Sequence, residues 1–200
     1  MKVSIIKYNA GNVQSVIFAL NRLGIDPLLT DNPEEIRTSD KVIFPGVGEA
    51  SSCMKSLRET GLDQLIPTLT QPVLGICVGL QLMCRHSEEK DTMGMGIFDL
   101  NVKKFTPAKQ KKADFKVPQM GWNTISSLKS PLFKDIPDKS YIYYVHSFYA
   151  ELGNETIATT DYVLPYSAAL NKNNFYAVQF HTEKSSEVGG KILSNFFDHC

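Results

Sequence analysis

A cysteine flanked by glycines, at the end of an apolar run, constrains the fold of this chain more than any other feature. Residues 72–81 read PVLGICVGLQ, with Gly75 and Gly79 two positions either side of Cys77. Glycines at this spacing let a strand turn sharply into a helix. Such a turn lifts the cysteine above the edge of a sheet and places it at a helix N-terminus, where the thiolate is favoured over the thiol.

The overall composition excludes several classes of protein. The chain has 200 residues, 42% of them hydrophobic, with 21 basic and 21 acidic side chains. This length suffices for one core, so we expect a single domain over residues 1–200. Balanced charge gives no global field for nucleic acid or an anionic membrane. No stretch resembles a signal peptide or a membrane span, and we expect a soluble, cytoplasmic protein.

The cysteines give no sign of a metal or redox motif. Cys53, Cys77, Cys84 and Cys200 form no C-x-x-C pair. We therefore expect neither a metal ion nor a cofactor. We expect Cys77 and Cys84 about two turns apart on one helix, and Cys53 and Cys84 as small buried residues.

The two halves of the chain carry different patterns. The first half alternates expected strands (3–7, 27–30, 41–44 and 72–76) with expected helices (13–23, from Asn32 onward, 49–69 and after Cys77). The second half favours strands at 96–105, 141–150, 156–161 and 168–180, with a hairpin turn at 171–174 and a closing helix at 187–197. Together they predict an α/β fold with a mostly parallel sheet, flanking helices and an antiparallel extension in the second half.

His181 is the best candidate for a base that would act on Cys77. Residues 179–183 read QFHTE, and 104 positions separate the histidine from the cysteine. If this segment is extended, His181 and Glu183 share a face, and the carboxylate orients the imidazole. A nucleophile, a base and an orienting group are the parts that acyl transfer needs. The residues therefore indicate attack on a carbonyl carbon.

Other polar features have simpler interpretations. We expect His86 at the end of the helix after Cys77, His146 in a structural or substrate-wall position, and His199 near the chain end. The PGVG segment at 45–48 is either an oxyanion strand or a tight strand-to-helix turn. A basic stretch is expected to be a solvated hairpin or loop rather than a partner-facing patch; it comprises Lys103, Lys104, Lys109, Lys111, Lys112 and Lys116.

The motif G-x-C-x-G-x-Q followed by a distant H-x-E resembles the class I (triad) glutamine amidotransferases over essentially the whole chain. Within that family the chain is similar to the glutaminase subunits of imidazole glycerol phosphate synthases. The segments that carry this likeness are AGN at 10–12, PGVGEA at 45–50, PQMGWN at 118–123, YVHS at 144–147 and KS at 184–185. The QMGWN run best separates it from the anthranilate and GMP synthase relatives.

The resemblance implies a set of residue roles. Cys77 would attack the side-chain amide of glutamine, with His181 as base and acid and Glu183 as its orienting carboxylate. The oxyanion would meet the N–H of Val78 and one from the PGVG strand, at Val47 or Gly48. The substrate's amino-acid end would be held by Gln81, Glu89, Ser147 and Phe148.

The resemblance also implies a partner. Relatives form a heterodimer with a (β/α)₈ cyclase subunit, whose barrel carries ammonia to a phosphoribulosyl-formimino carboxamide ribotide. The products are imidazole glycerol phosphate, for histidine, and an aminoimidazole carboxamide ribotide. The expected interface residues are Asn12, Trp122, Tyr143 and Lys184.

One position departs from the family, because Thr182 stands where proline is usual. We expect reduced rigidity rather than lost function. Three alternatives stay open: an amidotransferase subunit of another synthase (anthranilate-type or sugar-modifying), a non-catalytic regulatory module, and a stand-alone cysteine hydrolase. We also expect the glycine-rich PGVG strand to be misoriented until the partner binds.

Overall fold

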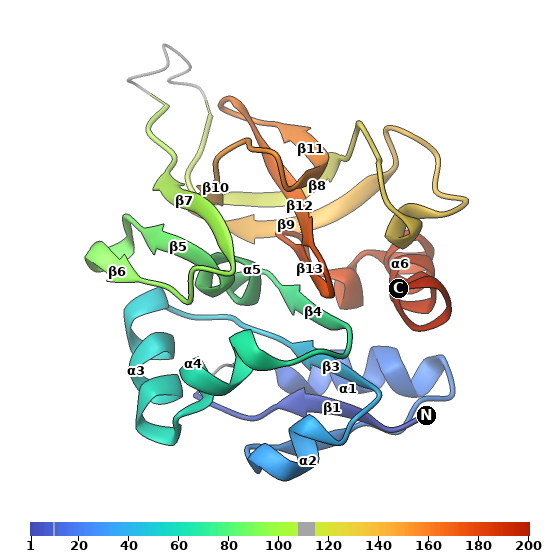
Figure 1. Ribbon diagram of the computed structural model, residues 1–200. Helices are drawn as coiled ribbons and strands as arrows, with labels where there is room; N and C mark the ends of the chain where they lie inside the picture. Colours follow the sequence, from blue (N-terminus) through green and yellow to red (C-terminus); the bar gives the residue numbers. More distant parts are fainter. Residues whose placement is uncertain (10, 108–114) are drawn as a thin grey trace.

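A seven-stranded sheet forms the centre of the computed structural model, which describes residues 1–9, 11–107 and 115–200 (Figure 1). Five neighbouring strands, β13, β4, β3, β1 and β2, run parallel, and β12 and β11 extend the sheet in antiparallel fashion. This confirms the predicted parallel sheet with an antiparallel extension. In sheet order the strands are β11 (Thr156–Asp161), β12 (Pro165–Lys172), β13 (Phe175–Val178), β4 (Val73–Ile76), β3 (Lys41–Phe44), β1 (Val3–Ile6) and β2 (Leu28–Thr30).

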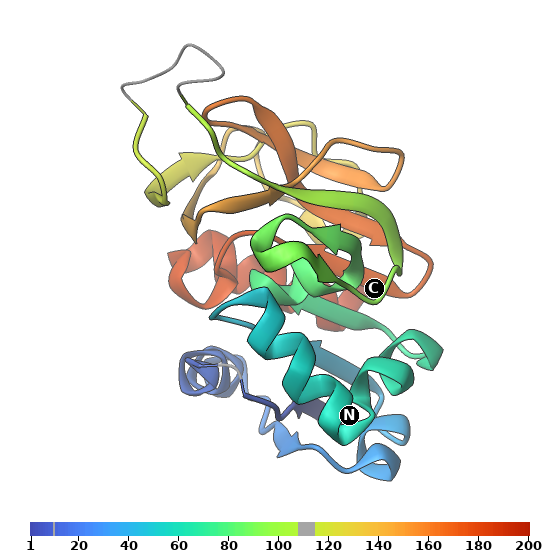
Figure 2. The same ribbon diagram turned by 90° about the vertical axis from the view of Figure 1, so that its left-hand side faces the viewer.

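Helices cover both faces of this sheet. Figures 1 and 2 show α1 (Val13–Arg22) and α6 (Ser186–His199) on one face, and α3 (Ala50–Thr60) and α4 (Leu62–Leu65) on the other. A local signal sets the start of α2 (Pro33–Arg37). The Asn32 side chain accepts hydrogen bonds from the N–H groups of Glu34 and Glu35 and so caps this helix. The remaining helices are α5 (Val78–Met83) and the 3₁₀ helices η1 (Ile66–Thr68), η2 (Glu89–Asp91), η3 (Pro131–Phe133) and η4 (Thr182–Lys184).

Two smaller sheets lie beside the central one. One has the order β10–β7–β5–β6, and the other pairs β8 with β9. Their bounds are β5 (Cys84–Ser87), β6 (Thr92–Met93), β7 (Phe98–Lys104), β8 (Gln119–Thr124), β9 (Tyr141–His146) and β10 (Phe148–Ala150).

The helix after the cysteine is shorter than predicted. It ends at Met83, and the chain continues directly into β5, so the predictions that Cys84 and His86 lie on that helix are wrong. The cause is tertiary pairing: β5 adds to β7 and β6, which a local helical pattern cannot reveal. Of the basic stretch, Lys103 and Lys104 end β7, whereas Lys109, Lys111 and Lys112 lie outside the described residues.

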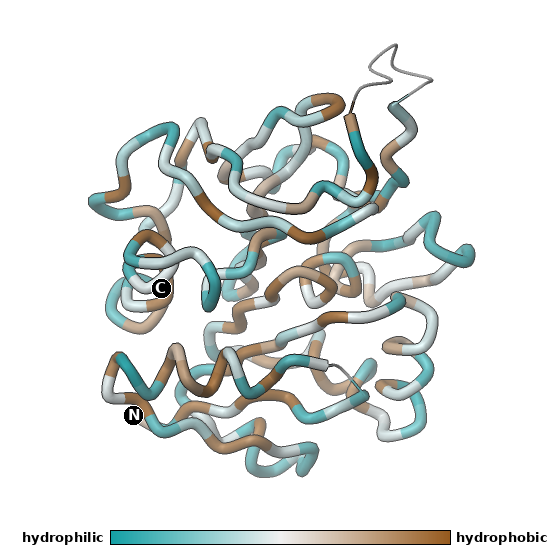
Figure 3. The backbone as a smooth tube through the Cα atoms, turned by 180° about the vertical axis from the view of Figure 1, so that it is seen from behind, coloured by the Kyte–Doolittle hydropathy of each residue, from teal (hydrophilic) through white to brown (hydrophobic). Residues whose placement is uncertain are grey.

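The core lies along the parallel strands. All residues of β1, β3 and β4 are buried, as expected for strands covered on both faces. Figure 3 shows hydrophobic colour concentrated along these central strands and hydrophilic colour on the outer turns. No helix in the described part of the chain is long and apolar enough to cross a membrane.

Candidate active site

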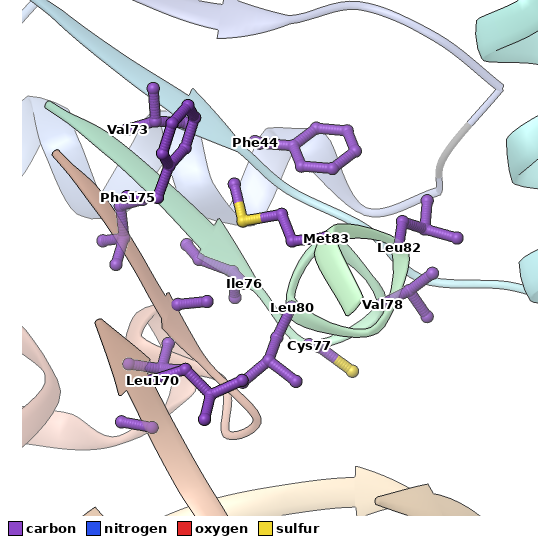
Figure 4. Packing of buried hydrophobic residues seen from close by; sticks show 14 of the residues in the cluster. Phe44, Val73, Ile76, Cys77, Val78, Leu80, Leu82, Met83, Leu170 and Phe175 are labelled. Atoms are coloured by element: carbon purple, nitrogen blue, oxygen red, sulfur yellow. The ribbon is translucent and has the colours of Figure 1, made fainter. Parts of the chain in front are cut away.

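Cys77 occupies a strained turn between β4 and α5. Its φ of 55° and ψ of −108° are unusual for a residue with a side chain, and such strain concentrates at functional sites. The Cys77 N–H donates to the Val178 carbonyl at 2.8 Å, which ties the turn to the neighbouring strand. A Cβ atom at Gly79 would lie 2.2 Å from the Phe44 carbonyl oxygen, so only glycine fits there. In Figure 4 the Cys77 sulfur points away from the packed side chains of Phe44 and Met83.

His181 reaches the same edge of the sheet from the adjacent strand. β13 pairs in parallel with β4, with Val178 opposite Ile76, so the two strand ends adjoin. The His181 side chain is 5% exposed, and its Nδ1 lies 2.7 Å from Oε1 of Glu183, whose side chain is 2% exposed. The extended H-x-E segment predicted from sequence is wrong in detail, because Glu183 lies in the 3₁₀ turn η4. The turn still brings the carboxylate to the imidazole.

The environment of His181 favours its charged form. Burial opposes protonation, but hydrogen bonds to Cys77 and Glu183 and the negative charge on those groups raise the pKa of His181 to about 10. An imidazolium beside the sulfur stabilises a thiolate. A protonated imidazole beside the sulfur is the arrangement that nucleophilic attack on a carbonyl carbon requires.

A cavity of about 290 Å³ opens over the cysteine. It brings together residues that are far apart in sequence, including every side chain expected to hold the substrate. Its lining consists of Val47, Gly48, Cys77, Val78, Gln81, Glu89, Pro118, Val145, His146, Ser147, Phe148 and His181. His146 belongs to the wall, in line with one of the two positions expected for it; burial lowers its pKa to about 4 and keeps it neutral.

Gln179 is the functional candidate that sequence reasoning missed. Its amide oxygen accepts from Gln81 Nε2 at 3.0 Å, and its own Nε2 lies 3.8 Å from the Cys77 sulfur. Gln81 Nε2 also donates to the Phe148 carbonyl at 3.0 Å, which fixes the orientation of this amide. The available sequence signal was a glutamine two positions before His181, directly after the apolar run of β13, and the structure buries this side chain fully.

Two of the expected oxyanion donors, the N–H groups of Val78 and Val47, do not face a common point in this conformation. The Val78 N–H donates to the Gly46 carbonyl oxygen at 3.2 Å. The 46–47 peptide is trans, so its N–H, on Val47, points opposite to that carbonyl and away from Val78. Rotation of this one peptide would release the Val78 N–H and turn the Val47 N–H toward the cavity.

Glu89 enters the cavity from η2. Its Oε2 accepts a hydrogen bond from the Ala50 N–H, the first of α3, at 2.7 Å. Burial raises the pKa of Glu89, whereas the Ala50 N–H lowers it. A carboxylate at this depth is suited to pairing with a substrate ammonium group.

The four expected interface residues lie on neighbouring elements. The Trp122 and Tyr143 rings make an edge-on contact with centroids 5.9 Å apart, and Trp122 is 52% exposed, so it is not a core residue. Asn12 and Lys184 are exposed at the start of α1 and the end of η4, and the Tyr143 N–H donates to Ser185, the residue after Lys184. Asn12 also lines a small cavity of about 10 Å³ behind His181 and Glu183.

Known proteins resemble this chain over its full length. The sequence profile of the family "Glutamine amidotransferase class-I" matches residues 5–200. The "Imidazole glycerol phosphate synthase subunit HisH" of Bacteroides fragilis (strain YCH46) is 55% identical over 198 residues, which cover 99% of this chain and 100% of that protein. The Vibrio parahaemolyticus protein of the same name is 42% identical, covering 98% of each. A glutamine amidotransferase crystal structure shares the fold, with a TM-score of 0.75 at 16% identity, covering 99% of this chain and 98% of that one.

Proposed function

This chain belongs to the class-I glutamine amidotransferases, and we propose that it is the glutaminase subunit of an imidazole glycerol phosphate synthase in histidine biosynthesis. Full-length identity of 55% to a subunit of that name supports the assignment. The observation that carries the chemistry is the meeting of Cys77, His181 and Glu183 at two adjoining strand ends, beside a cavity of about 290 Å³. A cavity of this size can hold a glutamine molecule.

The first half-reaction transfers the glutamyl group to the enzyme. The Cys77 thiolate attacks the side-chain amide carbon of glutamine, and the carbonyl oxygen becomes an oxyanion. His181, held by Glu183, gives its proton to the departing nitrogen as the C–N bond breaks. The products of this step are ammonia and a thioester on Cys77.

The second half-reaction regenerates the thiol. His181, now neutral, takes a proton from water as the water oxygen attacks the thioester carbon. Glutamate leaves, and the proton on His181 restores the starting ion pair with the sulfur. No metal or cofactor takes part in this sequence of steps.

Orientation of glutamine follows from the polar groups of the cavity. Glu89 would pair with the substrate ammonium, and the Gln81 amide would use its oxygen, because its nitrogen is already engaged. Ser147 and Phe148 would border the same end of the substrate.

The oxyanion site would be completed only after a peptide rotation. The hydrogen bond from the Val78 N–H to the Gly46 carbonyl occupies one of the two expected donors. We assign rotation of the 46–47 peptide to the moment when the partner docks, which would supply donors from both Val47 and Val78. A latent site of this kind avoids wasting glutamine.

The partner is a (β/α)₈ cyclase subunit in this proposal. It would form a heterodimer over Trp122, Tyr143, Asn12 and Lys184, since exposed aromatic and cationic residues are common interface anchors. Released ammonia would pass into the cyclase, where it completes the imidazole ring. We place the complex in the cytoplasm, because free cysteines such as Cys53, Cys77 and Cys84 are typical of a reducing compartment.

Glutamate release from glutamine tests the proposal directly. The purified chain is assayed alone, with the cyclase subunit encoded in the same genome, and with cyclase plus a ribotide ligand. We expect activity that rises steeply only in the complex and vanishes in Cys77→Ala. Activity that ignores the cyclase, or that survives Cys77→Ala, would refute the assignment.

A further inference from the structure

The two residues after Glu89 have strained backbones. Lys90 and Asp91 take left-handed φ values of 51° and 49°. Residues with a Cβ atom adopt this conformation at a cost in free energy, and neighbouring contacts must hold them there. Lys90 is held by an ion pair, with Nζ 2.7 Å from Glu49 Oε2, and Asp91 is held by a hydrogen bond between Oδ1 and His86 Nε2 at 2.7 Å.

Two contacts join the segment that follows Gly48 to the segment around Glu89, and the Glu49–Lys90 ion pair is one of them. Gly48 and Glu89 both line the cavity. Glu49 and Ala50 directly follow Gly48, the last residue of the PGVG segment, which lies between β3 and α3. Ala50 binds the Glu89 carboxylate through its N–H, and Glu49 binds the next residue, Lys90, through its carboxylate. We call these four residues, Glu49, Ala50, Glu89 and Lys90, the clamp.

The clamp has consequences for the charge next to Glu89, although neither Glu49 nor Lys90 itself lines the cavity. Lys90 follows the residue proposed to bind the substrate ammonium, and a free lysine there would repel that group. The ion pair with Glu49 balances the positive charge of Lys90 and holds its side chain at the start of α3. The hydroxyl of Ser51 donates to the other Glu49 oxygen and fixes the carboxylate.

We propose that the Glu49–Lys90 ion pair is a positioning device, which aims Glu89 at the ammonium group of glutamine and keeps the Lys90 charge out of that subsite. This inference rests on the proposed glutaminase function. Glu49 and Lys90 are positioning residues, because they act through Glu89 and touch no reacting atom.

Glutamine binding to a Cys77→Ala background tests the proposal, since that variant cannot turn glutamine over. Calorimetric titration gives Kd for the parent, for Glu49→Lys and for the charge swap Glu49→Lys/Lys90→Glu. The Glu49 side chain is 34% exposed and the Lys90 side chain is 66% exposed, so solvent weakens the ion pair. We expect Glu49→Lys to weaken binding about three- to tenfold, and the swap to restore it to within about twofold.

The same helix offers a matched control. Lys55 and Glu59 form an exposed ion pair on α3, with Nζ and Oε1 3.9 Å apart, outside the lining of the cavity. Glu59→Lys should leave the Kd for glutamine unchanged. In the complex with the cyclase, Glu49→Lys in the otherwise wild-type chain should raise KM for glutamine with little change in kcat.

The outcomes separate this inference from the proposed function. Absence of glutamine binding in the Cys77→Ala parent overturns both. Binding by the parent with an unchanged Kd in Glu49→Lys overturns the clamp alone, and so does a weakened Kd that the charge swap fails to rescue. A fall in Tm without a change in Kd would make the ion pair purely structural and would equally overturn the proposal.

Discussion

His146 should make this protein sensitive to mild acid. The ring is buried, Nδ1 lies 2.7 Å from the Phe148 carbonyl oxygen, and the Tyr166 hydroxyl lies 3.2 Å from Nε2. Burial, opposed by the hydrogen bond to Phe148, lowers the pKa of His146 from 6.5 to about 4. In the unfolded chain the ring titrates near 6.5, so between these values the unfolded state binds one more proton than the folded state.

The sign and size of the effect follow from that difference. The contribution of His146 to the free energy of unfolding is constant above pH 6.5. As the pH drops from 6.5 toward 4, the free energy of unfolding falls by about 1.4 kcal/mol per pH unit, and by about 3 kcal/mol in total. For a chain of this size that loss lowers Tm by roughly 6–12 °C. His146→Asn keeps a donor for the Phe148 carbonyl but cannot titrate.

Thermal unfolding of the wild-type chain and of His146→Asn between pH 7.5 and 4 measures the effect. Other titrating groups, including His181, are common to both proteins and cancel in the difference. We expect the wild type to lose about 3 kcal/mol relative to the variant over this range. Parallel pH profiles, or a His146 NMR titration centred above pH 6, would refute the reasoning.

Four further changes test other parts of the structure. Gln179→Leu removes the amide beside the nucleophile and should lower kcat/KM about tenfold, measured by glutamate release. Gly79→Ala places a Cβ atom 2.2 Å from the Phe44 carbonyl oxygen and should destabilise the fold by more than about 2 kcal/mol in urea unfolding. Thr182→Pro should change glutamine turnover less than tenfold. The preceding residue is already extended, and the Thr182 hydroxyl makes no hydrogen bond within the described residues. A larger gain would mean that the triad is misaligned in the wild-type chain. Trp122→Ala should weaken cyclase binding by about 2 kcal/mol in a titration of the two subunits.

Sequence patterns predicted the parallel core well because its signals are local. Asn32 caps its helix as expected, and β11 has the predicted bounds. The helix predicted over 49–69 is divided at Gly61, whose φ of 71° separates α3 from α4. The helix after Cys77 was overextended, because the apolar pattern continues through Cys84 while pairing with β7 draws that segment into a strand.

The site was predictable in its side chains but not in its backbone. The cysteine turn and the distant H-x-E can be found from residue types and spacing alone. The direction of the Gly46 carbonyl cannot, because glycine accepts either orientation of the peptide. Gln179 escaped notice for a related reason: its contacts join β13 to α5 and depend on which strands are neighbours.

The parallel pairing of β4 with β13 also determines when the site comes into existence. The proposed nucleophile follows β4 and the proposed base follows β13, and about a hundred residues of chain, which supply both smaller sheets, separate these two strands. A ribosome-bound chain that has completed β4 carries the thiol without its base. Because long-range parallel pairing comes late in folding, the reactive pair should form only after β8 and β9, which carry Trp122 and Tyr143, have been synthesised. Chain order thus prevents a partly made protein from acting on its substrate.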